Sequence, residues 1–556
     1  MRMRTRFVWS LALVLSLALL LAPGALSGST SSTHARATTW TVAPGGVAGG
    51  SASIRSLSPA LSPIRGVRRI PHSVAAAAPL VARAPQASGQ PVAAATPSLL
   101  ANFNGTSSRD SEVTNFGQEF EPPDQGLCAG NGFVVEMVNS AYTVYKPNGA
   151  VVTGPFNVNG PFDEGLTEFT SDPRCHYDAA TNTWFAAILF ISADNTTSRI
   201  DLAVNTSGDP TKLWTVYRID TTDVGGKTGP KHPGCPCFGD QPLLGIDKFN
   251  VYVSTNEFSI LGPQFNGAQI YAIAKSDLTK PGFQPPSTPA HFVHFDKLTN
   301  SDGSVAASVQ PALTTGTPNA EFFMDSLDPN GTFDQRLGVW ALTNPKVVAT
   351  GGTPSLSNVV ITSEAYGIPP GAEQKGSASL LDSGDDRMQQ VQFINGELWG
   401  ALDTSVTIPQ DSAARAGAAW FDVHPNLSNG AISGARIRGQ GYVSLAGNYV
   451  LYPAIQATPA GDVGMVMTLS GARRFPSAAY SVLPSGGTSF GNINVAAAGT
   501  TNYDPDATRW GDYSWAVLDP SGTSLWMATE YVPPKASQTT DGARNWGTRV
   551  INLALS

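Results

Sequence analysis

Charged residues are scarce in this chain of 556 residues. They make up 14% of it, while Gly and Pro together contribute 56 + 42 = 98 residues. Helical bundles and coiled coils need many charged positions and few Gly or Pro, so the composition argues against them and favours turn-rich β structure. The net charge of −8 argues against a nucleic acid or an anionic membrane as the partner.

Common catalytic motifs are also missing. The chain has only seven His, with no His-x-x-Glu-His and no Gly-x-Ser-x-Gly, so zinc peptidases and serine hydrolases lack their signatures. No Walker A or Rossmann fingerprint is present either, which leaves nucleotide binding without support.

The N-terminus has the pattern of an export signal. Arg2, Arg4 and Arg6 precede an apolar run at 7–21, and small residues follow, with Ala-x-Ala at 35–37 and weaker cleavage options near Ala25 and Ser27. The run is shorter than the ~20 residues that a membrane-spanning helix needs. No later stretch could span a bilayer as a helix. We therefore expect a signal peptide at 1–37, no membrane span in the mature chain, and a secreted, extracellular product.

Four cysteines fit an oxidising compartment. Cys128, Cys175, Cys235 and Cys237 all lie in the first half of the chain, and the sequence does not choose among their pairings. A Cys235–Cys237 bond is expected least, because one intervening residue strains disulfide geometry. At least one bond should join neighbouring repeats. A zinc site is the alternative, but no His cluster accompanies the cysteines.

The chain divides into three parts. Residues 38–97 are rich in Ala, Pro and Ser without alternating apolar residues, and are predicted to be a disordered leader after the signal peptide. Order should begin near Ser98, so that 98–556 form one domain.

That domain contains a repeat. Each copy begins with a characteristic short motif, often built on an Asp, and continues as two β-rich runs joined by a turn. The motifs lie at positions 124, 172, 240, 311, 386, 453 and 512. Their spacing leaves room for four short strands each, which predicts an all-β fold: a seven-bladed β-propeller of four-stranded antiparallel blades. A β-sandwich is the alternative, but it would not repeat one unit in this way. Residues 545–553 should pair with 99–103 to close the ring.

Several motifs carry a resemblance to known proteins. They are 121–126 (Glu-Pro-Pro-Asp-Gln-Gly), 239–242 (Gly-Asp-Gln-Pro), 386–390 (Asp-Arg-Met-Gln-Gln) and 509–514 (Arg-Trp-Gly-Asp-Tyr-Ser). Over 98–556 the chain resembles a group of secreted bacterial β-propeller proteins, most of them uncharacterised, which implies a propeller and export. More distantly it is similar in architecture to sialidases and other propeller glycosidases, although their Asp-boxes are not matched.

Carboxylates recur at the expected ends of the first hairpin in three repeats. Asp240 and Glu257 are 17 residues apart, as are Asp386 and Asp403, and Asp512 and Glu530 are 18 apart. Each pair should face across one antiparallel hairpin, about 5 Å apart, and point into a central funnel. Single residues that should join them there are Asp124, Asp172, Arg387 and Arg509.

Three interpretations stay open. In a glycosidase, Glu257 and Glu530 would be proton donors and Asp240, Asp386 and Asp512 bases or nucleophiles. Arg387 and Arg509 would then bind substrate with Asp124 and Asp172, and sugar rings would stack on Tyr452, Trp510 and Tyr513. The same carboxylates could hold calcium, or cap turns and pair with arginines as structure only. We expect a secreted propeller that recognises an extracellular glycan or related polymer, with hydrolysis as a further hypothesis. The alternative is a non-catalytic module that binds a cell-surface protein.

Overall fold

The computed structural model describes residues 29–31, 34–50, 97–117, 120–165, 168–226, 229–280, 289–327, 329–503, 509–542 and 544–555. Most of the predicted signal peptide and residues 51–96 of the predicted leader lie outside them. The helices within this part are short: α1 (Ser108–Thr114), α2 (Lys275–Leu278) and the 3₁₀ turns η1 (Gly160–Phe162), η2 (Pro345–Thr350) and η3 (Lys535–Ser537). None of them is long and apolar enough to cross a membrane.

The strands pair in antiparallel groups of four that follow the chain order. The first three groups are β5 (Gly126–Gly130), β6 (Phe133–Met137), β7 (Ala141–Tyr145), β8 (Val151–Asn157); β9 (Phe169–Asp178), β10 (Thr183–Ile191), β11 (Ser198–Asn205), β12 (Leu213–Asp220); and β13 (Cys237–Ile246), β14 (Asn250–Ser259), β15 (Phe265–Ala274), β16 (Ala290–Asp296).

The following groups continue the pattern. They are β17 (Gln310–Thr314), β18 (Ala320–Ser326), β19 (Asp334–Thr343), β20 (Ser355–Tyr366); β21 (Met388–Ile394), β22 (Glu397–Ile408), β23 (Asp411–Ser428), β24 (Ala431–Val443); β25 (Tyr449–Ala457), β26 (Val463–Gly471), β27 (Arg474–Leu483), β28 (Asn494–Ala497); and β29 (Trp515–Leu518), β30 (Ser524–Tyr531), β31 (Gly547–Ala554), β4 (Ser98–Ser107).

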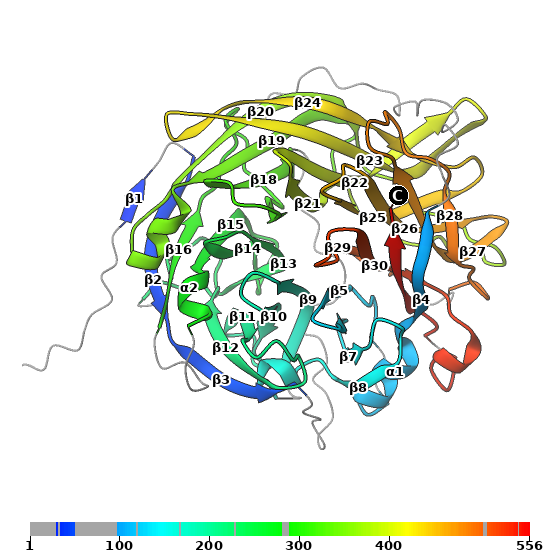
Figure 1. Cartoon of the computed structure of the whole chain (residues 1–556), viewed down its shortest axis with the longest axis horizontal. Coiled ribbons are helices and arrows are strands. Elements are labelled where there is room, and N and C mark those ends of the chain that lie inside the picture. Colours follow the sequence, from blue (N-terminus) through cyan, green and yellow to red (C-terminus); the bar gives the residue numbers. More distant parts are fainter. Residues whose placement is uncertain are drawn as a thin grey trace, which may run out of the picture.

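These sheets stand around a common centre, as in a β-propeller (Figure 1). The first strand of each group lies innermost. Among these inner strands, β17 pairs in parallel with β13 on one side and with β21 on the other. Buried aromatic and aliphatic side chains fill the space between neighbouring sheets; one such cluster combines Trp184 and Trp214 with residues of β5, β6 and β7. The predicted repeat of antiparallel hairpins is thus confirmed.

The first hairpin of a group often has the turn that its sequence predicts. Asn131 and Gly132 between β5 and β6 have φ of 47° and 78°, and Asn395 and Gly396 between β21 and β22 have φ of 55° and 86°. Two successive positive φ angles form the tight turn that matches strand twist, and Asn-Gly adopts it at least cost. The turns therefore fix the hairpin register locally.

The ends of the domain meet in one sheet, as predicted. β4 pairs antiparallel with β31, so that Asn102 lies opposite Ile551. The blue-cyan β4 and the red β31 belong to opposite ends of the colour scale but share one sheet (Figure 1). This pairing gives the last group its fourth strand and removes an exposed edge.

Part of the predicted leader is folded, together with residues 29–31 and 36–37 of the predicted signal peptide, which corrects the sequence analysis. β2 (Arg36–Val42) pairs with β16 and β3 (Pro44–Gly49) pairs with β12, while the short β1 (Ser29–Ser31) pairs with β2. Both strands run along the periphery and cover the outer edges of two neighbouring sheets (Figure 1). Composition suggested disorder, but 36–42 are Arg-Ala-Thr-Thr-Trp-Thr-Val, a β-rich run that gains backbone partners from an unpaired sheet edge.

All four cysteines form disulfides. Cys128 in β5 bonds Cys175 in β9, which confirms a bond between neighbouring repeats. Cys235 bonds Cys237, the pairing that the sequence analysis expected least. The turn at residue 236 places their Cα atoms 4.4 Å apart, within the range that disulfides bridge, so the expected geometric obstacle does not arise.

Candidate functional site

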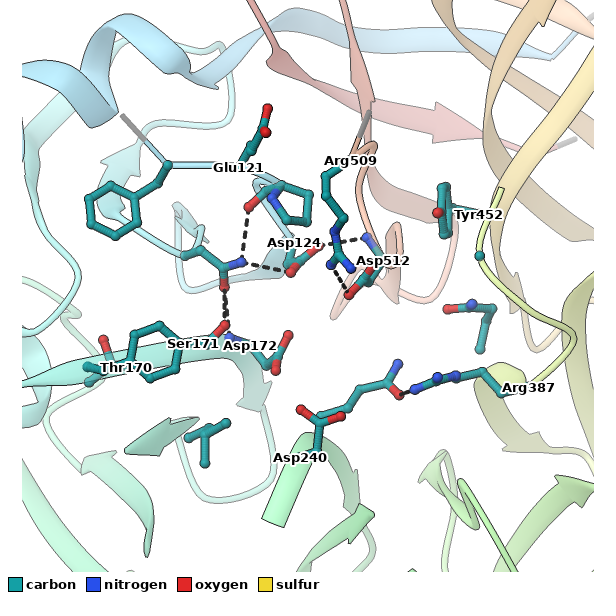
Figure 2. A pocket seen from close by; sticks show the side chains of 18 of the residues that line it. Glu121, Asp124, Thr170, Ser171, Asp172, Asp240, Arg387, Tyr452, Arg509 and Asp512 are labelled. Carbon is teal, nitrogen blue, oxygen red and sulfur yellow. Dashed lines mark hydrogen bonds and ion pairs between the residues drawn. The ribbon is translucent and has the colours of Figure 1, made fainter. Parts of the chain in front are cut away.

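A pocket opens at the centre, where several inner strands begin. It encloses about 200 Å³, and Figure 2 shows carboxylates and two arginines from different sheets converging on it. Its charged lining residues are Glu121, Asp124, Asp172, Asp240, Asp385, Arg387, Arg509 and Asp512. The aromatic lining residues are Phe120, Phe169, Phe238 and Tyr452.

Backbone irregularities at the strand starts aim side chains into this pocket. Asp124, Asp172, Gln241 and Tyr452 have φ between 48° and 59°, a left-handed conformation that is uncommon for such residues. The last three each precede a Pro, and the sheet register shifts at each of these pairs. Pro lacks the N–H that a ladder needs, so the pair bulges out. Backbone strain of this kind concentrates at functional sites.

One rim of the pocket is a network centred on Asp124. Its carboxylate accepts hydrogen bonds from Asn139 Nδ2 at 2.7 Å and from the backbone N–H of Asp512 at 2.6 Å. Asp512 in turn pairs with Arg509, whose Nη2 lies 2.6 Å from Asp512 Oδ2 (Figure 2). Burial, followed by the negative charges of Asp512 and Asp172, raises the pKa of Asp124 well above its ordinary value.

Hydrogen bonds to Tyr513 and Asn139 position Asp172 in the pocket. Its carboxylate accepts a hydrogen bond from the Tyr513 hydroxyl at 3.1 Å, and its backbone N–H donates to Asn139 Oδ1 at 2.7 Å. The guanidinium of Arg174 stacks 3.2 Å from the centre of the Tyr513 ring. Burial raises the pKa of Asp172, while the charge of Arg174 and the Tyr513 hydrogen bond counteract that rise.

Asp240 faces Asp172 across the pocket floor (Figure 2). Burial, and next the charge of Asp172, raise the pKa of Asp240 to about 7, although Arg387 lowers it. Arg387 donates to both oxygens of Asp385 at 2.7 Å and to Gln241 Oε1 at 2.5 Å. Asp240 therefore remains partly protonated near neutral pH. The neighbouring carboxylate, Asp172, has two partners that favour its charged form, Tyr513 and Arg174.

The structure brings together seven of the predicted site residues. Those that line the pocket are Asp124, Asp172, Asp240, Asp512, Arg387, Arg509 and Tyr452. Tyr513 stands behind Asp172. Trp510 is fully buried, with its Nε1 3.2 Å from Thr468 Oγ1, so it does not offer a face for sugar stacking.

The expected pairs across hairpins do not meet in the pocket. Asp240 lies opposite Asn256, and Glu257, one residue further, lies opposite Gly239. Because successive side chains of a strand point to opposite faces, a shift of one residue sends Glu257 away from Asp240. Glu257 instead lies 2.8 Å from His232 Nδ1.

The other predicted carboxylates support backbone near the pocket. Asp386 accepts from the N–H of Asn330 at 2.8 Å, and Asp403 accepts from the N–H of Tyr452 at 2.7 Å. Glu530 accepts from the N–H of Gly511 at 2.6 Å, next to Asp512. Asp386 and Glu530 therefore accept hydrogen bonds from backbone N–H groups and do not line the pocket.

Seven polar lining residues were missed: Glu121, Asn139, Thr170, Ser171, Gln241, Asp385 and Gln389. Glu121 and Gln241 stand inside the motifs on which the resemblance rests. Asp385 directly precedes the predicted Asp386. Only the bulged backbone decides which residue of each motif faces inward, and the sequence pattern does not reveal that register.

Two groups of acidic, His or Cys side chains among the described residues lie close enough together to share a metal ion. They are Cys235–Cys237–Glu257 and Asp223–His232–Glu257. The pocket carboxylates form no such group within the described ranges, so the calcium hypothesis gains no geometric support there.

No protein-family model and no curated protein sequence matches the chain. Similar solved structures include an α-L-arabinanase of Penicillium chrysogenum, with 10% identity and a TM-score of 0.34 over 82% of this chain and 98% of that one. An endo-1,5-α-L-arabinanase of Thermotoga petrophila has 10% identity and a TM-score of 0.27 over 78% and 98%. The Dos1 propeller has 9% identity and a TM-score of 0.34 over 81% and 82%. Likeness at this level carries no argument about function.

Proposed function

We propose that this protein is a secreted, seven-bladed β-propeller enzyme that hydrolyses glycosidic bonds in an extracellular glycan. The four-stranded groups described above are its blades, with the last blade closed by β4. Two disulfides and the export pattern at 2–21 support secretion, with cleavage near Ala25 or Ser27, which keeps Arg36 and β2 in the mature chain. The observation that carries the enzymatic part is the unequal pair formed by Asp240 and Asp172 on the pocket floor.

Glycoside hydrolysis needs one carboxyl that donates a proton and another that acts as base or nucleophile. Asp240, with a pKa of about 7, is the proton donor. Asp172, whose charged form is supported by Tyr513 and Arg174, is the base or nucleophile. Burial raises the pKa of both carboxyls, and at Asp172 the Tyr513 hydrogen bond and the charge of Arg174 counteract the rise. Such differences in surroundings are the usual basis for assigning the two roles.

The charges of the pocket favour a neutral or basic glycan. Six carboxyl side chains and two guanidinium groups line it. Asp385 engages Arg387 and Asp512 engages Arg509, so neither arginine is available as an isolated cation for an acidic sugar. Guanidinium N–H groups suit sugar hydroxyls as hydrogen-bond acceptors.

The test is a panel of neutral, amino-sugar and uronic-acid polysaccharides, with release of reducing ends as the measurement. We expect hydrolysis of a neutral or amino-sugar polymer, and loss of it in Asp240→Asn and Asp172→Asn. Asp194→Asn, in the exposed turn between β10 and β11, is the matched control. Binding without cleavage by the wild type would replace the enzyme with a non-catalytic glycan-binding propeller. Neither binding nor cleavage on the whole panel would contradict the proposal.

A further inference from the structure

A second polar cluster lies on the same sheet as Asp240, further from the centre. It comprises Asp223, His232 and Glu257, which are respectively 2%, 6% and 1% exposed. His232 Nδ1 lies 2.8 Å from Glu257 Oε2 and 3.3 Å from Asp223 Oδ2. One imidazole nitrogen therefore faces two carboxylates inside the protein.

The surroundings hold these three side chains in place. His232 Nε2 lies 2.6 Å from Asp296 Oδ2, and Arg36 Nε donates to Asp296 Oδ1 at 2.8 Å. Gln269 Nε2 donates to Asp223 Oδ2 at 2.9 Å. A carboxylate on the far nitrogen of an imidazole is the usual support of a metal-binding His, because it fixes the ring and leaves the other nitrogen for the metal.

Two independent observations favour a cation here. Asp223 Oδ1 is buried and has no hydrogen-bond partner among the described residues. The charges also do not balance. Three carboxylates, Asp223, Glu257 and Asp296, face Arg36 and His232, which leaves a net charge of −2 in a buried place when His232 is neutral and −1 when it is protonated. Uncompensated buried charge is strongly unfavourable.

We infer that Asp223, His232 and Glu257 bind a divalent transition-metal cation such as Zn²⁺. The ion contributes the two positive charges that the cluster lacks, with His232 neutral and its Nε2–H donated to Asp296. One nitrogen and two carboxylate ligands suit Zn²⁺ or Mn²⁺ better than Ca²⁺, which prefers six to eight oxygens.

The site has a structural purpose that follows from its position. Asp223 and His232 lie in the segment between β12 and β13, Glu257 ends β14, and Asp296 and Arg36 connect β16 to the N-terminal β2. The metal therefore fastens this segment and the peripheral strand to one sheet. The alternative group, Cys235–Cys237–Glu257, lacks thiolates because both cysteines are in a disulfide.

The test uses the full chain with its disulfides intact, produced with and without added Zn²⁺. We expect about one zinc per chain by elemental analysis, and a higher Tm for the loaded form. Glu257→Gln and Asp223→Asn should each lower zinc occupancy at least ~10-fold. Asp240→Asn, on the same sheet but in the pocket, is the matched control and should keep full occupancy.

The inference would be overturned by a wild type that contains no zinc after production in its presence. Equal zinc occupancy in Glu257→Gln and wild type would overturn it as well. If the variants do not fold, X-ray absorption at the zinc edge of the wild type decides. Nitrogen and oxygen ligands alone are expected, and sulfur ligands would exclude this ligand set.

Discussion

The pocket and the Asp223–His232–Glu257 cluster are both acidic and belong in part to one hairpin, but they differ in what surrounds the carboxylates. Asp240 lines a cavity open to a ligand, whereas Glu257 is enclosed with His232 and Asp223. They stand on neighbouring strands and differ by one position in the register. The sheet face to which a side chain points, rather than its place near a strand end, therefore decides whether a carboxylate is available for chemistry.

The largest difference should appear in turnover. Asp240→Asn removes the proton donor of the pocket and should lower kcat by ~10²–10⁴-fold, the usual contribution of general acid–base catalysis. Its Tm should not fall, because the amide replaces a buried carboxyl whose charged form is unfavourable there. Steady-state kinetics on the polysaccharide identified in the panel checks the first part and calorimetry the second. An active Asp240→Asn variant would remove this residue from the mechanism.

At the Asp223–His232–Glu257 cluster, substitution should lower the stability of the fold rather than turnover. His232→Gln removes the imidazole that bridges the buried carboxylates of Glu257 and Asp296, and leaving buried charged groups without their partner costs about 3–5 kcal/mol. Chemical denaturation at pH 7 measures the loss. Asp194→Asn serves as the control, since its side chain is exposed and the substitution should leave the free energy of unfolding close to that of the wild type. Equal stabilities of His232→Gln and wild type would show that the cluster does not hold the fold.

The fold could be predicted from the sequence to a considerable depth. The repeated motifs predicted antiparallel hairpins and the pairing of β4 with β31, because turn residues and alternating apolar runs are local signals. Inner-strand starts were located closely enough to identify Asp124, Asp172, Asp240 and Asp512. The roles of Glu257, Asp386 and Glu530 were not predictable, because bulges at Asp172, Gln241 and Tyr452 shift the register by residues that no periodicity reveals.

The remaining failures have separate causes. The strands β2 and β3 gain order from the edges of β16 and β12, a partner that lies far away in the sequence. His232 is isolated in the sequence, and its carboxylate partners are 9, 25 and 64 residues away. Long-range contacts of this kind leave no local pattern.

The pH dependence of stability should separate the two regions further. The folded-state pKa of Asp240 is raised from 3.8 to about 7, so between these values the folded chain holds a proton that the unfolded chain has lost. Stability therefore falls as pH rises, by about 2–3 kcal/mol from pH 5 to pH 8 for this one group. Thermal unfolding should show a smaller loss in Asp240→Asn than in wild type over this range. An identical pH dependence in both would contradict the raised pKa.

The disulfides should give the smallest contrast. Cys128–Cys175 closes a long loop, with a sequence separation of 47, whereas Cys235–Cys237 has a separation of 2. In the chain-entropy model, the first stabilises by ~4 kcal/mol and the second by less than ~2 kcal/mol. Denaturation of the double variants Cys128→Ala/Cys175→Ala and Cys235→Ala/Cys237→Ala compares them. A larger loss in the second variant would reverse the expected order.

The protonation of Asp240 can be measured without knowing the substrate. The carboxyl ¹³C resonance of Asp240, identified by its absence in Asp240→Asn, is followed by NMR from pH 4 to pH 9. We expect a midpoint at about 7, which leaves Asp240 protonated enough to donate to a leaving group at neutral pH. A midpoint near 4, the ordinary value for an Asp, would contradict it.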